Sequence, residues 1–92
     1  MSRPPNIIFI GKKPIMTYVN ATLTLLSNEP IVTIKARGKS ITTAVDVSQM
    51  IVKRLNAVGY KVSGVRIFSE KMTSQDGKDR NVSTMELDIS RP

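Results

Sequence analysis

The chain has 92 residues, enough for one domain with a small hydrophobic core. It holds 14 lysines and arginines against 7 aspartates and glutamates, and the net charge of +7 predicts attraction to polyanions, nucleic acid first and an anionic membrane second. It has no cysteine and no histidine, which excludes disulfides, sulfur-ligated metals and the usual general base, and no apolar stretch approaches the roughly 20 residues of a membrane span.

The hydrophobic pattern divides the chain into strands and helices after a short polar segment. Residues 1–6 (MSRPPN) hold two prolines and predict a flexible arm, so one domain is expected at residues 7–92. Compact or alternating apolar runs predict strands, and apolar residues three or four apart predict helices. The expected elements are a strand at 7–10 buried on both faces, a helix at 14–27, a strand at 31–36, a helix at 39–57, and strands at 60–73 and 80–89.

The last two strands are joined through SQDGKD, in which Asp-Gly is a strong hairpin signal, because glycine accepts the positive φ that the turn needs. The resulting order, βαβαββ, predicts a single α/β (α+β) two-layer sandwich with both helices packed on one sheet.

Two lysines lie where the first helix is expected to begin. In IGKKP, Lys12 and Lys13 precede Pro14, a residue suited to the first helical position. Lysine is unfavourable beside the positive end of a helix, but the unpaired backbone N–H groups there can bind an anion. A phosphate held by the lysines and these N–H groups would explain the arrangement. The alternative is that both side chains simply extend into water.

A second basic cluster, KARGKS, again follows a strand and precedes a helix. Lys35, Arg37 and Lys39 alternate along an extended segment, so they can project to one side together. If the first two strands are parallel neighbours, their ends lie at the same edge of the sheet. Both basic clusters are therefore expected to be neighbours and to form one phosphate-binding surface.

The polar hairpin segment EKMTSQDGKDRN is the third candidate. Each of its strands spans ~8 residues and could project ~25 Å, far enough to follow a duplex into a groove. Its candidate contacts are Lys71, Lys78 and Arg80 on phosphates, and Ser74 and Gln75 on base or sugar edges. The alternative is an ordinary mobile surface loop, since three acidic residues in the segment reduce its positive charge.

Catalysis is not expected. Asp46, Glu86 and Asp88 are carboxylates within the expected elements, each is expected on a solvated face, and no set of acid, base and nucleophile can be assembled. Base stacking on the sheet is also not expected, because Phe9 and Phe68 lie in apolar runs. We expect no cofactor and no metal, and recognition through the nucleic-acid backbone.

Three segments together resemble the Alba family of small basic archaeal chromatin proteins: NIIFIGKKPIMTYV, IKARGKSITTAVD and MTSQDGKDRNVSTMELDI. The resemblance implies a fold similar to the C-terminal domain of bacterial translation initiation factor three. It also implies a homodimer that lays the paired lysines and the KARG segment over double-stranded DNA, with the two hairpins as arms along the minor groove. Lys12 matches a lysine whose acetylation weakens DNA binding in family members, Lys13 is its partner, and Arg37 and Lys39 match the second basic cluster.

One position departs from the resemblance. Many members carry a phenylalanine late in the second helix, where dimers pack side by side on DNA, and this chain has Leu55 there. The expected function is sequence-nonspecific DNA binding that organises chromatin in the cytoplasm. Two alternatives stay open: an RNA-binding component of a ribonucleoprotein, and a paralogue that forms heterodimers with another Alba protein and modulates its assembly.

Overall fold

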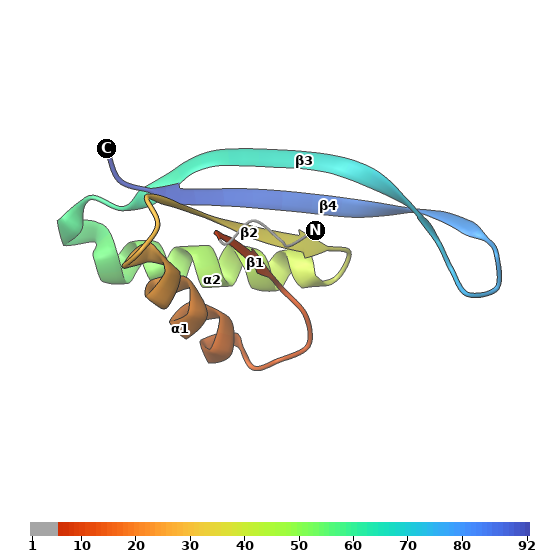
Figure 1. The fold of residues 1–92 in the computed structure, drawn as a ribbon, viewed down its shortest axis with the longest axis horizontal. Helices are drawn as coiled ribbons and strands as arrows, with labels where there is room; N and C mark the ends of the chain where they lie inside the picture. Colours follow the sequence, from red (N-terminus) through yellow and green to blue (C-terminus); the bar gives the residue numbers. More distant parts are fainter. Residues whose placement is uncertain (1–5) are drawn as a thin grey trace.

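The computed structural model describes residues 6–92, which form a four-stranded sheet and two helices (Figure 1). In chain order the elements are β1 (Ile7–Phe9), α1 (Ile15–Leu26), β2 (Ile31–Arg37), α2 (Ser40–Leu55), the short 3-10 helix η1 (Asn56–Val58), β3 (Lys61–Thr73) and β4 (Asp79–Ser90). The expected order βαβαββ is confirmed, and the bounds differ from the expected ranges by only one or two residues.

Of the arm expected at residues 1–6, only Asn6 lies within the described residues, and it is hydrogen-bonded to β2. Its carbonyl oxygen accepts the N–H of Thr33 at 2.8 Å, and its side-chain amide donates to the carbonyl oxygen of Ile31 at 3.2 Å. Asn6 therefore takes part in the hydrogen bonding of the sheet, and residues 1–5 of the expected arm lie outside the described residues.

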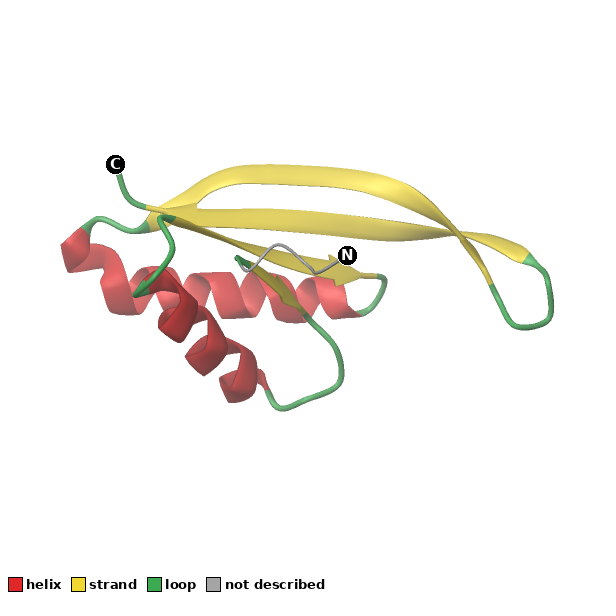
Figure 2. Cartoon of the chain, viewed as in Figure 1, coloured by secondary structure: helices red, strands yellow, loops and turns green. Residues whose placement is uncertain are grey.

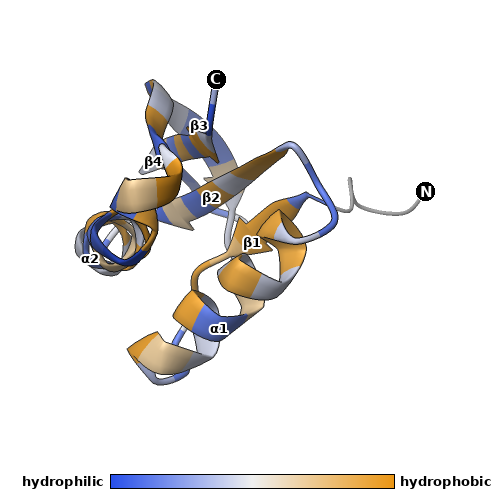
Figure 3. Cartoon of the chain, turned by 90° about the vertical axis from the view of Figure 1, so that its left-hand side faces the viewer, coloured by the Kyte–Doolittle hydropathy of each residue, from blue (hydrophilic) through white to orange (hydrophobic). Residues whose placement is uncertain are grey.

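The strands are arranged in the order β1-β2-β4-β3. β1 and β2 are parallel and are connected through α1, whereas β4 is antiparallel to both β2 and β3. Both helices lie on one face of the sheet, which leaves the opposite face uncovered by any described element (Figures 2 and 3). The two-layer sandwich is thus confirmed. Neither helix is long and apolar enough to cross a membrane, within the described part of the chain.

The core lies between the sheet and the two helices. Alternate residues of a strand point to opposite faces, so Val32 and Ile34 of β2 are fully buried beneath the helices. The antiparallel register places Ile89 and Leu87 of β4 beside them. The helices complete the core with buried apolar side chains: Tyr18, Val19 and Leu26 from α1, and Ala44, Val47 and Ile51 from α2.

β1 is only partly buried, so the prediction of a strand buried on both faces is wrong. β1 forms one edge of the sheet, its only strand partner among the described residues is β2, and all three of its residues are half-buried. An unbroken apolar run predicted burial on both faces, but the helices cover only one face. Ile8 packs against the core from β1.

The β3–β4 hairpin extends beyond the rest of the sheet as an arm (Figure 1). The last pair between β2 and β4 is Arg37 with Thr84, and beyond it β3 and β4 continue as a two-stranded ribbon. At the turn, the N–H of Ser74 donates to the carbonyl oxygen of Lys78 at 2.9 Å, and Gly77 has a φ of 82°. This left-handed conformation favours glycine and explains the Asp-Gly signal.

Candidate nucleic-acid interface

The two basic loops begin side by side at one edge of the sheet. β1 and β2 are parallel, and the N–H of Ile10 donates to the carbonyl oxygen of Lys35 at 2.9 Å. The β1–α1 loop, which carries Lys12 and Lys13, and the β2–α2 loop, which carries Lys39, therefore leave the sheet at the same end, from which the arm also projects (Figure 1). The expected proximity of the two basic loops follows directly from the parallel pairing.

The charges of three lysines at this edge are uncompensated. Lys12, Lys13 and Lys39 are exposed, and no carboxylate among residues 6–92 forms an ion pair with them. A hollow of about 360 Å³ lies at the ends of the two strands, and its lining consists of Phe9, Ile10, Lys35, Ala36, Arg37 and Ser40. This edge is suited to attract an anion.

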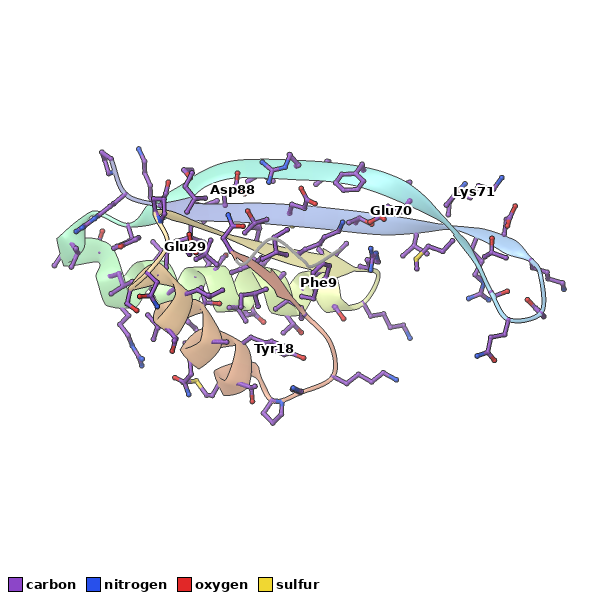
Figure 4. All side chains as sticks on the ribbon, viewed as in Figure 1. Phe9, Tyr18, Glu29, Glu70, Lys71 and Asp88 are labelled. Carbon is purple, nitrogen blue, oxygen red and sulfur yellow. The ribbon has the colours of Figure 1, made fainter. Side chains whose placement is uncertain are left out.

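A buried tyrosine organises the β1–α1 loop. The hydroxyl oxygen of Tyr18, a residue labelled in Figure 4, accepts the backbone N–H of Gly11 at 2.8 Å and that of Lys13 at 2.9 Å. These two donors precede the first residue of α1 and are paired with the phenol, so neither is free for an anion. The anion site expected at the helix start, from the N–H groups of the helix itself and the lysine side chains, stays a prediction. Tyr18 was not among the predicted site residues, because only its apolar spacing on α1 was visible in the sequence.

Lys35 is enclosed on the uncovered face of the sheet. Its ammonium lies 5.9 Å from the ring centre of Phe9 and 5.7 Å from that of Phe68, distances at which cation–π attraction operates. Its Nζ is also 3.6 Å from a carboxylate oxygen of Glu70 and 3.5 Å from one of Glu86. Only 17% of the Lys35 side chain is exposed, so its charge is already compensated within the protein.

The two phenylalanines lie on this same face and not in the core between sheet and helices. In the strand registers, Phe9 lies opposite Lys35 and Phe68 lies opposite Thr84. The apolar runs that contain them had indicated burial in the core. Successive side chains of a strand point to opposite faces of the sheet, and paired residues on neighbouring strands point to the same face. Each ring therefore lies on the uncovered face, like the residue paired with it.

Arg37 follows Lys35 on the same face and forms a two-bonded ion pair with Glu70 of β3. Nε donates to Oε1 at 3.2 Å, and Nη2 donates to Oε2 at 3.3 Å. The hydrogen bonds from Arg37 lower the pKa of Glu70 below its usual value, with smaller contributions from Thr84 and from the charge of Lys35. Arg37 and Lys35 do project to one side together, as expected, but toward carboxylates.

Through Glu86, which also contacts Lys35, the ion pairs continue into the other half of the uncovered face. Arg66 donates to Glu86 at 2.8 Å and to both carboxylate oxygens of Asp88 at 2.7 Å, and Asp88 also accepts the hydroxyl of Thr33 at 2.7 Å. Arg66 lowers the pKa of Asp88. The prediction that Glu86 and Asp88 are merely solvated is therefore wrong. Their partners come from β2 and β3, and only the strand register reveals them.

The arm carries exposed cations whose charges are only partly compensated. Lys71 pairs with Asp79 at 3.1 Å, whereas Lys78 and Arg80 have no ion-pair partner among residues 6–92, and Gln75 is exposed at the tip. Asp76 accepts hydrogen bonds from the hydroxyl of Ser74 and the N–H of Lys78, and these bonds lower its pKa. The turn is thus internally hydrogen-bonded and presents its remaining side chains to solvent.

Leu55, the residue that departs from the family pattern, is half-buried at the end of α2. It packs against the core and lines an apolar hollow of about 200 Å³ together with Leu23, Leu26, Ser27 and Tyr60. Part of its surface is therefore directed toward α1 and Tyr60.

These features define a class: a small basic α/β sandwich with a cationic sheet edge and a projecting β-hairpin arm. The chain belongs to the Alba family, whose model matches residues 6–69. It is 54% identical to the DNA/RNA-binding protein Alba of Nitrosopumilus maritimus (strain SCM1) over 84 residues, which cover 91% of this chain and 88% of that protein.

Solved structures agree with this assignment. Alba from Thermoplasma volcanium superposes with a TM-score of 0.83 at 40% identity, covering 94% of this chain and all of that one. ALBA1 from Trypanosoma brucei superposes with a TM-score of 0.73 at 24% identity, covering 98% of this chain and 72% of that one. At 24% identity, the similarity to the Trypanosoma brucei protein shows a common fold and nothing more.

Proposed function

We propose that this protein binds double-stranded DNA through its sugar-phosphate backbone, without sequence preference. The observation that carries the proposal is that the loops with Lys12, Lys13 and Lys39 leave the sheet at the same end, and that no described carboxylate forms an ion pair with these lysines. Lysines release condensed counterions when they meet phosphates, which favours binding at low salt. The net charge of +7 acts in the same direction. The printed name of the Nitrosopumilus maritimus relative, a DNA/RNA-binding protein, is consistent with this role.

The arm is proposed to extend the contact along the minor groove. Five residues of each strand, 69–73 and 79–83, lie beyond the last pair with β2. At about 3.3 Å per residue they give the paired strands a reach of roughly 17 Å before the turn, less than the ~25 Å expected from the sequence. Lys78 and Arg80 would meet phosphates, and Gln75 at the tip would touch base or sugar edges. Lys71 would contribute less, because Asp79 already compensates its charge.

The functional unit is proposed to be a homodimer. β3 is an edge strand, and it exposes 57% of Val65 and 73% of Ile67 on the side where α2 lies. Ile67 and Phe68 also line a largely apolar hollow of about 370 Å³ with Ile41 of α2. A cluster of exposed apolar side chains is typical of an interaction surface. A second copy of the chain would cover this cluster in the two-fold arrangement that is common for small oligomers.

The cellular role proposed here is chromatin organisation in the cytoplasm, by binding and not by catalysis. Lys12 is exposed and forms no ion pair with a described residue, so a modifying enzyme could reach it. Acetylation of Lys12 would remove a charge from the sheet edge and weaken binding. The second cluster would contribute through Lys39 and, where its ion pair opens, Arg37.

The test is a titration of labelled duplex DNA at several salt concentrations. If a dimer neutralises ~6 to 8 phosphates, the logarithm of the affinity should fall with the logarithm of salt at a slope of roughly −5 to −7. A nearly flat response would contradict backbone recognition. The alternative is an RNA-binding component of a ribonucleoprotein, which is also compatible with the name of the DNA/RNA-binding relative. Competition between duplex DNA and folded RNA at equal salt would distinguish the two.

A further inference from the structure

Glu70 lies at the root of the arm and contacts two cations of the candidate interface. It binds the guanidinium of Arg37 with two hydrogen bonds, of 3.2 and 3.3 Å, and lies 3.6 Å from Nζ of Lys35. Its strand partner is Val82, just beyond the last pairing between β2 and β4. One carboxylate thus compensates cations that the sequence had assigned to phosphate.

A carboxylate and a phosphate present the same pair of oxygens to an arginine. Both bind a guanidinium through two parallel N–H bonds, so Glu70 occupies the donors Nε and Nη2 that a phosphate would take. An internally paired arginine releases no counterion when DNA arrives, and it contributes little to salt-dependent affinity. Arg37 keeps the pKa of Glu70 low, so the carboxylate stays charged at neutral pH.

Arg37 is otherwise well placed to meet a phosphate. Its side chain is 37% exposed, and it lines the hollow at the sheet edge beside the lysine loops. It is the last residue of β2 and lies two residues before the exposed Lys39. Among the described residues, Glu70 is its only ion-pair partner.

We propose that Glu70 competes with nucleic-acid phosphates for the guanidinium of Arg37. It holds Arg37 in an ion pair that a phosphate must displace, and so it limits both the affinity and the salt dependence of the sheet edge. This inference rests on the proposed function and identifies a residue that tunes it. It predicts that the sheet edge works mainly with its three unpaired lysines, Lys12, Lys13 and Lys39, and gains one cation per protomer when Glu70 loses its charge.

The experiment compares Glu70→Gln with Asp46→Asn in a duplex-binding titration. Asp46 is exposed on α2 and has no ion-pair partner among residues 6–92, so the two variants gain the same net charge, and only the first releases Arg37. With labelled duplex between about 0.05 and 0.3 M salt, we expect E70Q to bind roughly fivefold to tenfold more tightly at about 0.1 M and to steepen the salt slope by about 1 per protomer. D46N should change affinity less than about twofold and leave the slope unchanged.

The same comparison in an Arg37→Met background tests whether the gain in duplex affinity of E70Q depends on Arg37. In this background, E70Q should give no more gain than D46N gives, because the arginine it would release is gone. If E70Q and D46N bind alike in the parent protein, Glu70 is not a competitor, although duplex binding itself stands. If E70Q binds more weakly, Glu70 instead positions Arg37, and the inference is overturned. If the parent protein fails to bind duplex at low salt, the proposed function fails first.

Discussion

The hydroxyl of Tyr18, a buried residue of α1, accepts the backbone N–H of Lys13 at 2.9 Å and that of Gly11 at 2.8 Å. A core residue thereby fixes the course of the loop that carries the paired lysines. The arrangement joins stability to function, because any change that frees the loop also disperses its charges.

Tyr18→Phe removes the oxygen that accepts both N–H groups. We expect a loss of about 1–3 kcal/mol in unfolding free energy, measured in urea, since two partly buried donors lose their partner. Duplex affinity should fall severalfold as the lysine loop becomes less ordered. Tyr60→Phe is the matched control, because no hydrogen bond of its hydroxyl is found within residues 6–92. Equal behaviour of the two variants would contradict the role of Tyr18.

Substituting Lys12 and Lys13 together by alanine should weaken duplex binding with the fold intact. Each lost phosphate contact should reduce the steepness of the salt slope by about 0.9. Stability should be unchanged or slightly higher, because two positive charges leave the positive end of α1. The control is Lys53→Ala with Arg54→Ala in the last turn of α2, which removes the same charge elsewhere. If both double variants lose affinity equally, net charge and not the sheet edge determines binding.

Ile67→Asp should separate the proposed homodimer. A charge placed in the apolar contact of β3 would be buried without a partner, and we expect the dimer to dissociate at least about a hundredfold more readily in sedimentation experiments. Met16→Asp is the comparison, since Met16 is also an exposed apolar residue but lies on α1, which packs against β1 and β2. A parent protein that sediments as a monomer at every concentration would refute the proposed dimer.

Gly64→Ala should disturb the Arg66 network from within the sheet. A Cβ at this position would lie 2.7 Å from Oδ2 of Asp88, closer than real contacts allow, so the carboxylate must shift and its hydrogen bonds with Arg66 and Thr33 are disturbed. We expect a loss of about 1–3 kcal/mol in urea unfolding. Ser69→Ala, at an exposed position of the same strand, should change little. A stable G64A variant would show that the network contributes little to folding.

The protein should lose stability in acid through Glu70 and Asp88. The pKa of each is held below its ordinary value, 4.5 and 3.8, by Arg37 and Arg66 respectively. A depressed folded pKa adds stability that is present above the unfolded value and is lost as the pH falls through the folded value. Urea midpoints should therefore fall below about pH 4, and Asp88→Asn should flatten this dependence. Glu29→Gln, at a residue outside these ion pairs, should leave it unchanged.

Local sequence patterns were sufficient to predict the elements and their order. The helical spacing on α1 and α2 and the alternation on β4 record which faces meet the core, and each pattern is complete within a few neighbouring residues. The turn at Gly77 follows in the same way. The shared edge of the lysine loops was expected only if the first two strands are parallel neighbours, and the strand pairing shows that they are. Motif resemblance identified the Alba family, which the comparisons confirm.

Only the tertiary structure decided which charges are free. Lys35 and Glu70 are far apart in the sequence, and so are Arg37 and Glu70, yet the register of three strands brings them into contact. The edge position of β1 and the uncovered face that holds Phe9 also depend on strand order, which no single segment encodes. Charge counting treats every cation alike, whereas strand pairing compensates Lys35 and Arg37 and leaves Lys12, Lys13 and Lys39 exposed to the solvent.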